Sequence, residues 1–174
     1  TNTTVSGIFY TPNTASSCGL LVYQGAPTTV TGFTATACMV GAYFENTDGA
    51  LNGITIGGNT SGVASTGVFA YNSNASLASR AAAKSALRGV PAASPVTEEG
   101  ASAKLSPNAT SSAPVTVSVG PGCLTGDNLV GSYGVQAYSA GGPLVCNVNG
   151  LELTDWEYGI VANGTNVTTN AHQN

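Results

Sequence analysis

Short β-prone runs, separated by turn residues, are the feature that most constrains the fold of this chain. The runs are rich in Thr, Val, Ile, Phe and Tyr, which suit a pleated, half-buried strand. Gly, Asn and Pro separate them, and Asp48-Gly49 and Asn52-Gly53 are turn signals. We expect strands at residues 3–11, 20–24, 28–36, 38–44, 53–56, 67–71, 115–119, 129–132, 134–139, 144–148, 150–154 and 156–162.

This pattern predicts an all-β fold. About ten short strands, with turns every 8–12 residues or so, favour a β-sandwich or jelly-roll-like arrangement. The length of 174 residues favours one domain over 1–174. No internal repeat with a fixed period is evident. Residues 163–174 are polar and are expected to form a C-terminal tail.

The segment 76–114 has a different composition. A short helix is expected at about 76–88, because Ser76 is a good cap, Ala is dense, and Gly89 and Pro91 follow. The rest is Pro/Ala/Ser-rich and resembles a surface loop. We therefore expect a helix-plus-loop excursion between two halves of the sandwich.

The basic residues have an unusual distribution, because all four lie inside that excursion. Arg80, Lys84 and Arg88 recur every four residues and would form one stripe on a helix. The stripe could meet an acidic patch on a neighbouring subunit, pair with Glu98 and Glu99 in its own loop, or be a solvated face. The fourth basic residue is Lys104.

The charge content is low. Charged residues make up 7% of the chain, against roughly 25% in an ordinary soluble domain. Four Lys+Arg are too few to neutralise a nucleic-acid backbone, so no nucleic-acid partner is expected. No apolar stretch approaches the length of about 18 residues that a transmembrane helix needs, so no such segment is expected.

The cysteines indicate an oxidising compartment. Cys18, Cys38, Cys123 and Cys146 form an even set without CxxC spacing, which gives no support to a zinc site. We expect disulfides Cys18–Cys38 and Cys123–Cys146, because each pair flanks one predicted hairpin. Two other connectivities, or four reduced buried thiols, are the alternatives. The chain starts at Thr1 without Met, as a processed secreted protein would; an arbitrary boundary is the alternative.

Asn-x-Ser/Thr sequons suggest N-linked glycans, which would make a surface with few ions more soluble. Extracellular or cell-surface localisation is therefore expected. The six sequons begin at Asn2, Asn59, Asn74, Asn108, Asn163 and Asn166.

No catalytic residue is expected. The single histidine, His172, is a poor candidate for a catalytic triad. Glu152, Asp155 and Glu157 are the best acidic group, and paired carboxylates hydrolyse glycosidic bonds, so a glycoside hydrolase is one alternative. Solvent-facing carboxylates beside a core Trp156 explain the same pattern.

No metal site or cofactor is predicted either. Loop oxygens around Glu45, Asp48, Asp127 and Asn128 are of the type that Ca²⁺ prefers. Ordinary turn chemistry needs no ion and explains the same residues.

Two further patterns leave binding open. Tyr133 with Tyr138, or Trp156 with Tyr158, could present rings to a sugar, which suggests a carbohydrate-binding or adhesin module; core packing explains these aromatic residues equally. The pairs Thr29/Thr31 and Thr34/Thr36 would form a flat ice-binding face, or simply a solvated strand face.

The N-terminal segment 1–11 suggests self-assembly. It is a β-prone strand at a chain end, and such a strand completes its own sheet or the open sheet of the next copy. Head-to-tail use of one contact gives an open filament. We therefore expect a secreted structural subunit of a filament, pilus or surface polymer, with copies of itself as partner. The expected interface residues are Thr3, Thr4, Val5, Ile8, Phe9 and Tyr10.

Overall fold

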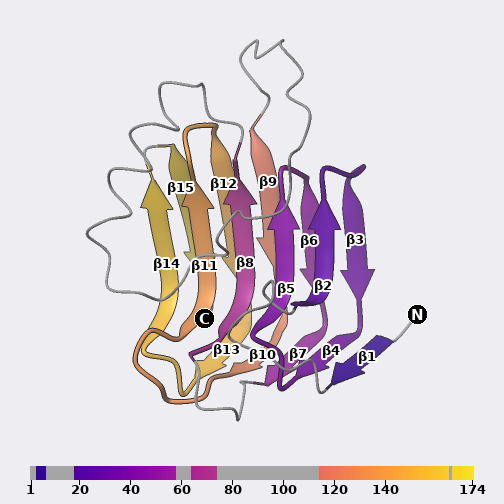
Figure 1. The fold of residues 1–174 in the computed structure, drawn as a ribbon, viewed down its shortest axis with the longest axis vertical. Coiled ribbons are helices and arrows are strands. Elements are labelled where there is room, and N and C mark those ends of the chain that lie inside the picture. The colour runs from indigo at the N-terminus through magenta and orange to yellow at the C-terminus, as the bar shows by residue number, and fades with distance from the viewer. Residues whose placement is uncertain (1–2, 7–17, 58–63, 74–113, 165) are drawn as a thin grey trace, which may run out of the picture.

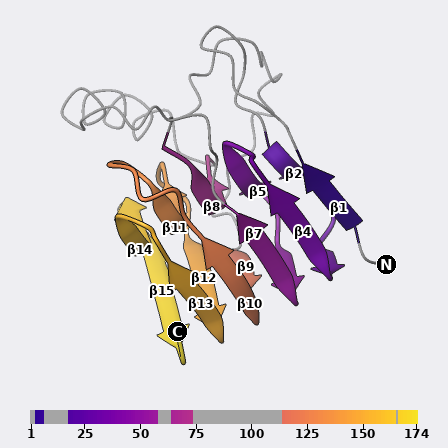
Figure 2. The same ribbon diagram turned by 90° about the horizontal axis from the view of Figure 1, so that it is seen from below.

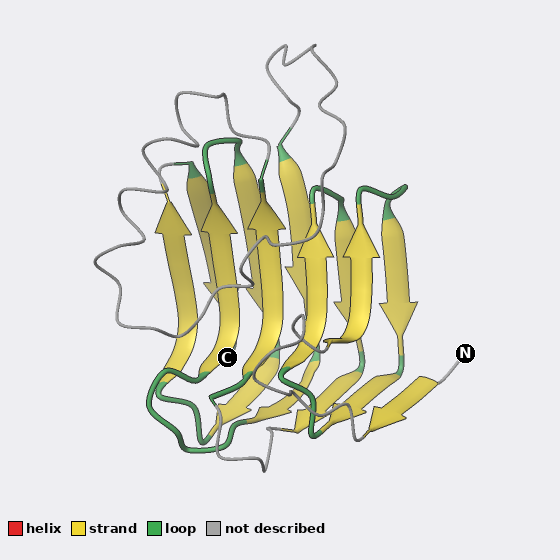
Figure 3. Ribbon diagram, viewed as in Figure 1, coloured by secondary structure: helices red, strands yellow, loops and turns green. Residues whose placement is uncertain are grey.

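The described part of the chain consists of strands joined by short turns. The computed structural model describes residues 3–6, 18–57, 64–73, 114–164 and 166–174 (Figure 1). Within these ranges no residue is helical (Figure 3). The predicted helix at 76–88 lies outside the described residues, as does the rest of the excursion up to residue 113. No described segment forms a helix with the length and hydropathy to cross a bilayer.

The strands form three parallel five-stranded sheets. Sheet A has the order β1 (Thr3–Ser6), β4 (Phe33–Thr36), β7 (Ile54–Gly57), β10 (Gly122–Thr125), β13 (Leu151–Thr154). Sheet B has the order β2 (Cys18–Tyr23), β5 (Val40–Glu45), β8 (Thr66–Asn72), β11 (Tyr133–Ser139), β14 (Tyr158–Gly164). Sheet C has the order β3 (Thr28–Thr31), β6 (Gly49–Asn52), β9 (Val115–Val119), β12 (Leu144–Asn149), β15 (Val167–His172).

The chain visits sheets A, B and C in turn, five times, and each such pass is called a coil here. Every strand pairs in parallel with the equivalent strand of the next coil. The sheets form three walls around one core: sheet B lies in front of sheet C in Figure 1, and sheet A closes the lower side. This architecture is a parallel β-helix.

The predicted β-sandwich or jelly roll is therefore wrong. Those folds join antiparallel strands by hairpins, whereas all pairings here are parallel. Many of the strand-forming segments were predicted correctly, but the same local pattern is compatible with both folds. The tight turns join strands of different sheets within one coil, and not neighbouring strands of one sheet.

The corner between sheets C and A explains the largest local error. The predicted strand 28–36 is two strands, β3 and β4, separated by Gly32 at φ +69°. Gly53 and Gly150 occupy the same corner in later coils, at φ +60° and +65°. A positive φ suits glycine and turns the chain through the corner within one residue. The expected turns at Asp48-Gly49 and Asn52-Gly53 therefore flank a short strand, β6.

Other boundaries also differ from the predictions. The polar segment 163–174 contains the end of β14 and the whole of β15, and β10 was not predicted. The predicted strand 129–132 forms a turn and loop instead.

The core is built from columns of apolar side chains that run along the β-helix axis. In sheet A, Ala35, Ile56 and Leu124 stack in register, and all three are buried. The equivalent column in sheet C contains Leu51, Val119 and Val148. In sheet B it contains Ala42, Val68 and Val135. Because each coil covers the core of the previous one, the described residues cover the core faces of the first and last coils only from one side.

Candidate functional site

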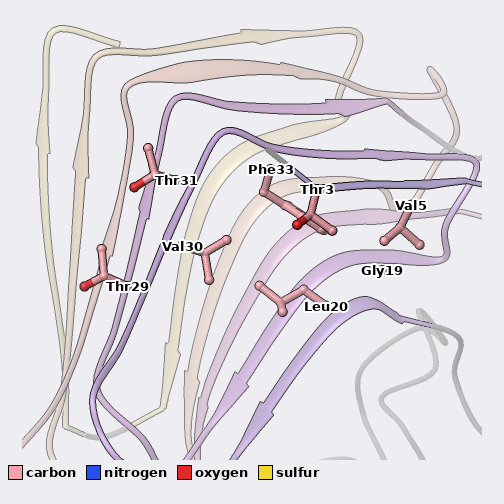
Figure 4. Close-up of a pocket in the computed structure, with 8 residues that line it drawn as sticks. All are labelled: Thr3, Val5, Gly19, Leu20, Thr29, Val30, Thr31 and Phe33. Carbon is pink, nitrogen blue, oxygen red and sulfur yellow. The ribbon is translucent and has the colours of Figure 1, made fainter. Parts of the chain in front are cut away.

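The N-terminal end of the β-helix has a hollow lined by both apolar residues and threonines. A cavity of about 380 Å³ is lined there by all three strands of the first coil and by Phe33 of the second (Figure 4). Val5 of β1, Leu20 of β2 and Val30 of β3 gather around it and are only partly buried. Phe33 is 2% exposed. Apolar side chains in a hollow of this kind are typical of a contact surface.

The C-terminal end shows the complementary feature. Leu153 of β13, Ile160 of β14 and Val167 of β15 pack against the core and are also only partly buried. Each of these strands is the last in its sheet and pairs with one neighbour among the described residues. The buried hydroxyl of Thr169 in β15 has no hydrogen-bond partner within the described structure. Buried polar groups normally have a partner, so this end has the character of an incomplete layer.

The expected subunit-interface strand is shorter than predicted and pairs within the chain. β1 runs parallel to β4, with Thr3 opposite Phe33 and Val5 opposite Ala35. Its other edge faces no described strand. Ile8, Phe9 and Tyr10, the remaining predicted interface residues, lie outside the described residues.

The acidic group at 152–157 is dispersed. Glu152 is exposed on the outer face of sheet A, opposite Cys123. Asp155 lies at φ +60° in the corner between β13 and β14. Glu157 accepts a hydrogen bond from the Gly131 amide. The three carboxylates do not come together as a potential metal-binding group within the described residues. A glycosidase needs only one pair of carboxylates, so this alternative stays a prediction.

The loop carboxylates considered for calcium hold corners of the fold. Asp127 Oδ2 accepts hydrogen bonds from the Ser65 amide and hydroxyl, at 2.9 and 2.7 Å. Asp48 Oδ1 accepts one from the Thr116 amide at 2.7 Å. Asn128 lies at φ +54°, a conformation that Asn tolerates better than most residues. These carboxylates therefore join successive coils.

The outer face of sheet B has an aromatic row whose rings cover one another. Tyr43 stacks on Phe69 with 5.0 Å between ring centroids, Phe69 lies 5.9 Å from Tyr71, and Tyr71 lies 5.4 Å from Tyr138. The Tyr43 hydroxyl donates to Glu45 at 2.7 Å, and burial together with this bond raises the pKa of Tyr43. Sugar rings stack on free aromatic faces, and the faces between these neighbouring rings are already occupied.

The structure regroups the two predicted sugar-binding pairs, Tyr133 with Tyr138 and Trp156 with Tyr158, and Tyr158 is 45% exposed. Tyr133 stacks on Tyr158 at 5.1 Å between centroids. The Trp156 indole N–H donates to the Leu124 carbonyl at 2.9 Å, and the ring packs against the core. The carbohydrate-binding alternative stays a prediction, with Tyr133 and the exposed Tyr158 as its stacked pair.

The structure brings one predicted cysteine pair together and separates the other. Burial and the neighbouring Cys38 raise the pKa of Cys18 to about 11, which places these two side chains within electrostatic reach. Cys146 faces the core and is fully buried. Cys123 faces outward in sheet A, with Sγ 3.8 Å from Thr125 Oγ1. Both disulfides stay predictions, and only Cys18–Cys38 has favourable placement.

Thiol labelling in the folded protein tests this placement. We expect a thiol reagent at pH 7.5 to label Cys123 readily and Cys146 only after unfolding. Burial raises the pKa of Cys146 to about 12, so almost no reactive thiolate exists at that pH. Mass spectrometry of labelled peptides gives the readout. Rapid labelling of Cys146 in the folded protein would contradict its inward placement. If Cys123 were protected from the reagent and a reductant removed this protection, the second predicted disulfide would be supported.

Two sequons fall within the described residues. Asn163 is exposed near the end of β14. Asn166 is exposed too, and its amide donates to the Gly141 carbonyl at 2.6 Å. A glycan at Asn163 would extend into solvent, whereas one at Asn166 would compete with that bond. Asn2, Asn59, Asn74 and Asn108 lie outside the described residues, as do all four basic residues.

Comparison with known proteins adds no relative. No family model matches the chain, and neither the curated proteins nor the solved structures gave a match. The functional argument therefore depends on the fold and on the surfaces at its two ends. Sequence reasoning missed the residues of those ends, notably Leu20, Val30 and Ile160. The recurring corner glycines were the signal that marks the coils.

Proposed function

We propose that this chain is an extracellular structural subunit that stacks head to tail, so that the coils of successive copies form one continuous β-helix. The observation that carries the proposal is the pair of incompletely covered core faces at opposite ends of the same β-helix. A fully buried Val, Leu or Ile side chain is worth about 1.5–3 kcal/mol relative to an exposed one. The side chains at both ends are only half-buried, so burying them fully at a junction would provide much of this free energy.

The columns of the core supply the register for such a junction. Along sheet A, Leu153 occupies the column that begins with Val5. Along sheet B, Ile160 occupies the column that begins with Leu20. When a second copy continues the in-register stacking, its Val5 follows Leu153 and its Leu20 follows Ile160. Each contact places apolar side chains of similar size against each other.

The main chain favours the same arrangement. All strands are parallel, so each sheet has one free edge at the first coil and its other, different free edge at the last coil. Strand pairing of one with the other is heterologous, and a heterologous contact that does not close generates an open filament. The predicted strand addition thus becomes the addition of a whole three-stranded coil.

Two polar features are consistent with this junction. Residues 3–6 and 18–31 contain no Asp, Glu, Lys or Arg, so the first coil brings no ionic side chain that would have to be desolvated. Thr169 lies in the sheet C column that begins with Thr28. Stacking therefore places the Thr28 of the next copy beside the unpartnered Thr169 hydroxyl.

Secretion and glycosylation belong to the same proposal. The low charge, the sequons and the even number of cysteines support an extracellular setting. Exposed Asn163 points away from the core columns, so a glycan there would decorate the side of a filament.

A pair of variants on one strand tests the proposal. We expect wild-type protein to form filaments in negative-stain images and to sediment as a concentration-dependent series. Leu20→Lys should weaken association by about 100-fold or more, because it places an unpaired ammonium group in a dry junction. Leu21→Lys adds the same charge to the same strand but at an outward position that is 56% exposed, so it should still assemble.

Folding is checked separately by circular dichroism on both variants. The proposal fails if wild-type protein is monomeric at every concentration, or if Leu20→Lys and Leu21→Lys assemble equally well.

A further inference from the structure

The outer face of sheet A differs from the other two faces in that small hydroxyl-bearing residues line it in register. One column is formed by Thr4, Thr34 and Thr55 in the first three coils. Cys123 and Glu152 continue this column in the last two coils.

A second column runs beside the first. It contains Ser6 and Thr36 in the first two coils, and Thr125 and Thr154 in the last two. Gly57 lies between them in β7. Figure 2 shows the five strands of sheet A side by side as one continuous surface.

The two columns form a regular two-dimensional grid. Neighbouring strands lie about 4.7–4.9 Å apart, and alternate residues on one strand lie about 6.6 Å apart. Every strand of sheet A has four residues and contributes two outward positions. The strand spacing is close to the repeat between water oxygens along the short axis of hexagonal ice. A threonine in this grid therefore repeats its hydroxyl and its methyl at intervals similar to those of the ice surface.

The hydroxyl groups of this face are available to solvent. Thr154 Oγ1 donates to Thr125 Oγ1 at 3.4 Å. The hydroxyls of Thr34, Thr36 and Thr55 make no hydrogen bond with the described residues, so water must satisfy them. A hydroxyl both donates and accepts, as does each water molecule in ice.

The side chains are also pre-organised. Threonine is branched at Cβ and has restricted χ1 freedom, so ordering its hydroxyl against a lattice costs little entropy. A Cβ added to Gly57 would lie 3.4 Å from the methyl of Thr36, which shows that this methyl lies against the neighbouring strand. Glu152 is the only charged residue on the described part of the face, so few ions compete with the lattice for water.

Neither of the other two faces has such an unbroken run of threonines on adjacent strands among the described residues. Sheet B presents stacked aromatic rings and Glu45. Sheet C mixes hydroxyls with other residues: Val145 separates Thr116 from Thr168 in one column, and Asn170 donates to Asn147 at 2.9 Å in the neighbouring column. These amides satisfy each other and are not spaced as hydroxyl and methyl pairs. Sheet A is thus the face with chemistry suited to ordered water.

We propose that the outer face of sheet A binds ice, with Thr34, Thr36 and Thr55 at the centre of the contact. The surface water that the threonine grid orders becomes continuous with the crystal lattice, while the methyl groups fill the spaces between water molecules. The sequence suggested one ice-binding face made of both threonine pairs; Thr34/Thr36 belongs to the proposed face, whereas Thr29/Thr31 lies on sheet C. The inference does not depend on head-to-tail assembly, although stacking would lengthen the grid.

A matched pair of substitutions in the third coil tests the site. We expect wild-type protein to slow ice recrystallisation and to partition into slowly growing ice. Thr55→Lys places a hydrated charge in the middle of the grid and should reduce both effects at least tenfold. Thr116→Lys places the same side chain on the outer face of sheet C, in the same coil, and should retain wild-type behaviour.

The same assays on Leu20→Lys separate this inference from the proposed assembly, since a monomer with an intact sheet A should still enter ice. Wild-type protein that is excluded from growing ice overturns the inference. Equal activity of Thr55→Lys and Thr116→Lys overturns it too. Loss of lateral association between copies without any effect on ice would instead identify the face as a protein contact.

Discussion

Mixing two variants that cannot polymerise, Leu20→Lys and Ile160→Lys, should restore one junction and produce a discrete 1:1 dimer. Leu20→Lys blocks the N-terminal end and leaves the C-terminal end intact, and Ile160→Lys does the reverse. In the mixture, the unchanged ends are the C-terminal end of Leu20→Lys and the N-terminal end of Ile160→Lys, and these two can form one junction. Sedimentation equilibrium of each variant alone should give a monomer, and the equimolar mixture should give twice that mass.

The dimer distinguishes head-to-tail stacking from a two-fold symmetric contact. In an isologous contact each end binds its own equivalent, so each variant alone would dimerise through its intact end. Val161→Lys, on the same strand as Ile160 but facing outward, is the matched control and should still polymerise alone. A mixture that stays monomeric, with wild-type filaments intact under the same conditions, would rule out this junction.

Local structure was more predictable from the sequence than its assembly. Thr, Val and Ile alternation identified segments such as β9 without error, because strand propensity and side-chain alternation are local properties. Parallel pairing could not be read in this way. β8 lies beside β11 although about sixty residues separate them in the chain, and the excursion between them hides the period.

The candidate sites show the same division. The solvent-facing carboxylates and the core-packed Trp156 match one of the two explanations that the sequence offered, although residues 155–157 form a corner and not part of the predicted strand. The residues of the two end faces depend on which coil is first and which is last in the β-helix. Leu20 and Leu21 are identical neighbours in the sequence, yet one lines the end cavity and the other is exposed. Only the register of the coils tells them apart.

A ladder of glycines makes a second large effect predictable. The second residue of every strand in sheet B is glycine: Gly19, Gly41, Gly67, Gly134 and Gly159. A Cβ on any of the first four would lie 2.5–2.7 Å from the carbonyl oxygen of the glycine in the next coil. Neighbouring strands of sheet B approach too closely here for a side chain. Their backbone atoms cannot move apart without breaking the sheet.

Gly67→Ala should therefore lower the free energy of unfolding by about 1–3 kcal/mol, the usual cost of overpacking a core. The new methyl would lie 2.5 Å from the Gly134 oxygen and 2.8 Å from Leu124 Cδ2, in the middle of the β-helix where both neighbouring coils are fixed. Gly25→Ala is the control, because its nearest neighbour would be 3.9 Å away, and it should be neutral or slightly stabilising.

Thermal or urea unfolding followed by circular dichroism measures both changes, in the monomeric Leu20→Lys background so that assembly does not contribute. The midpoint for Gly67→Ala should fall by several degrees, at about 2–4 °C per kcal/mol for a chain of this size. Equal stability of the two variants would mean that the sheet B strands are not stacked with glycine over glycine. The parallel register that aligns the end columns for assembly would then be wrong as well, since the same pairings define both.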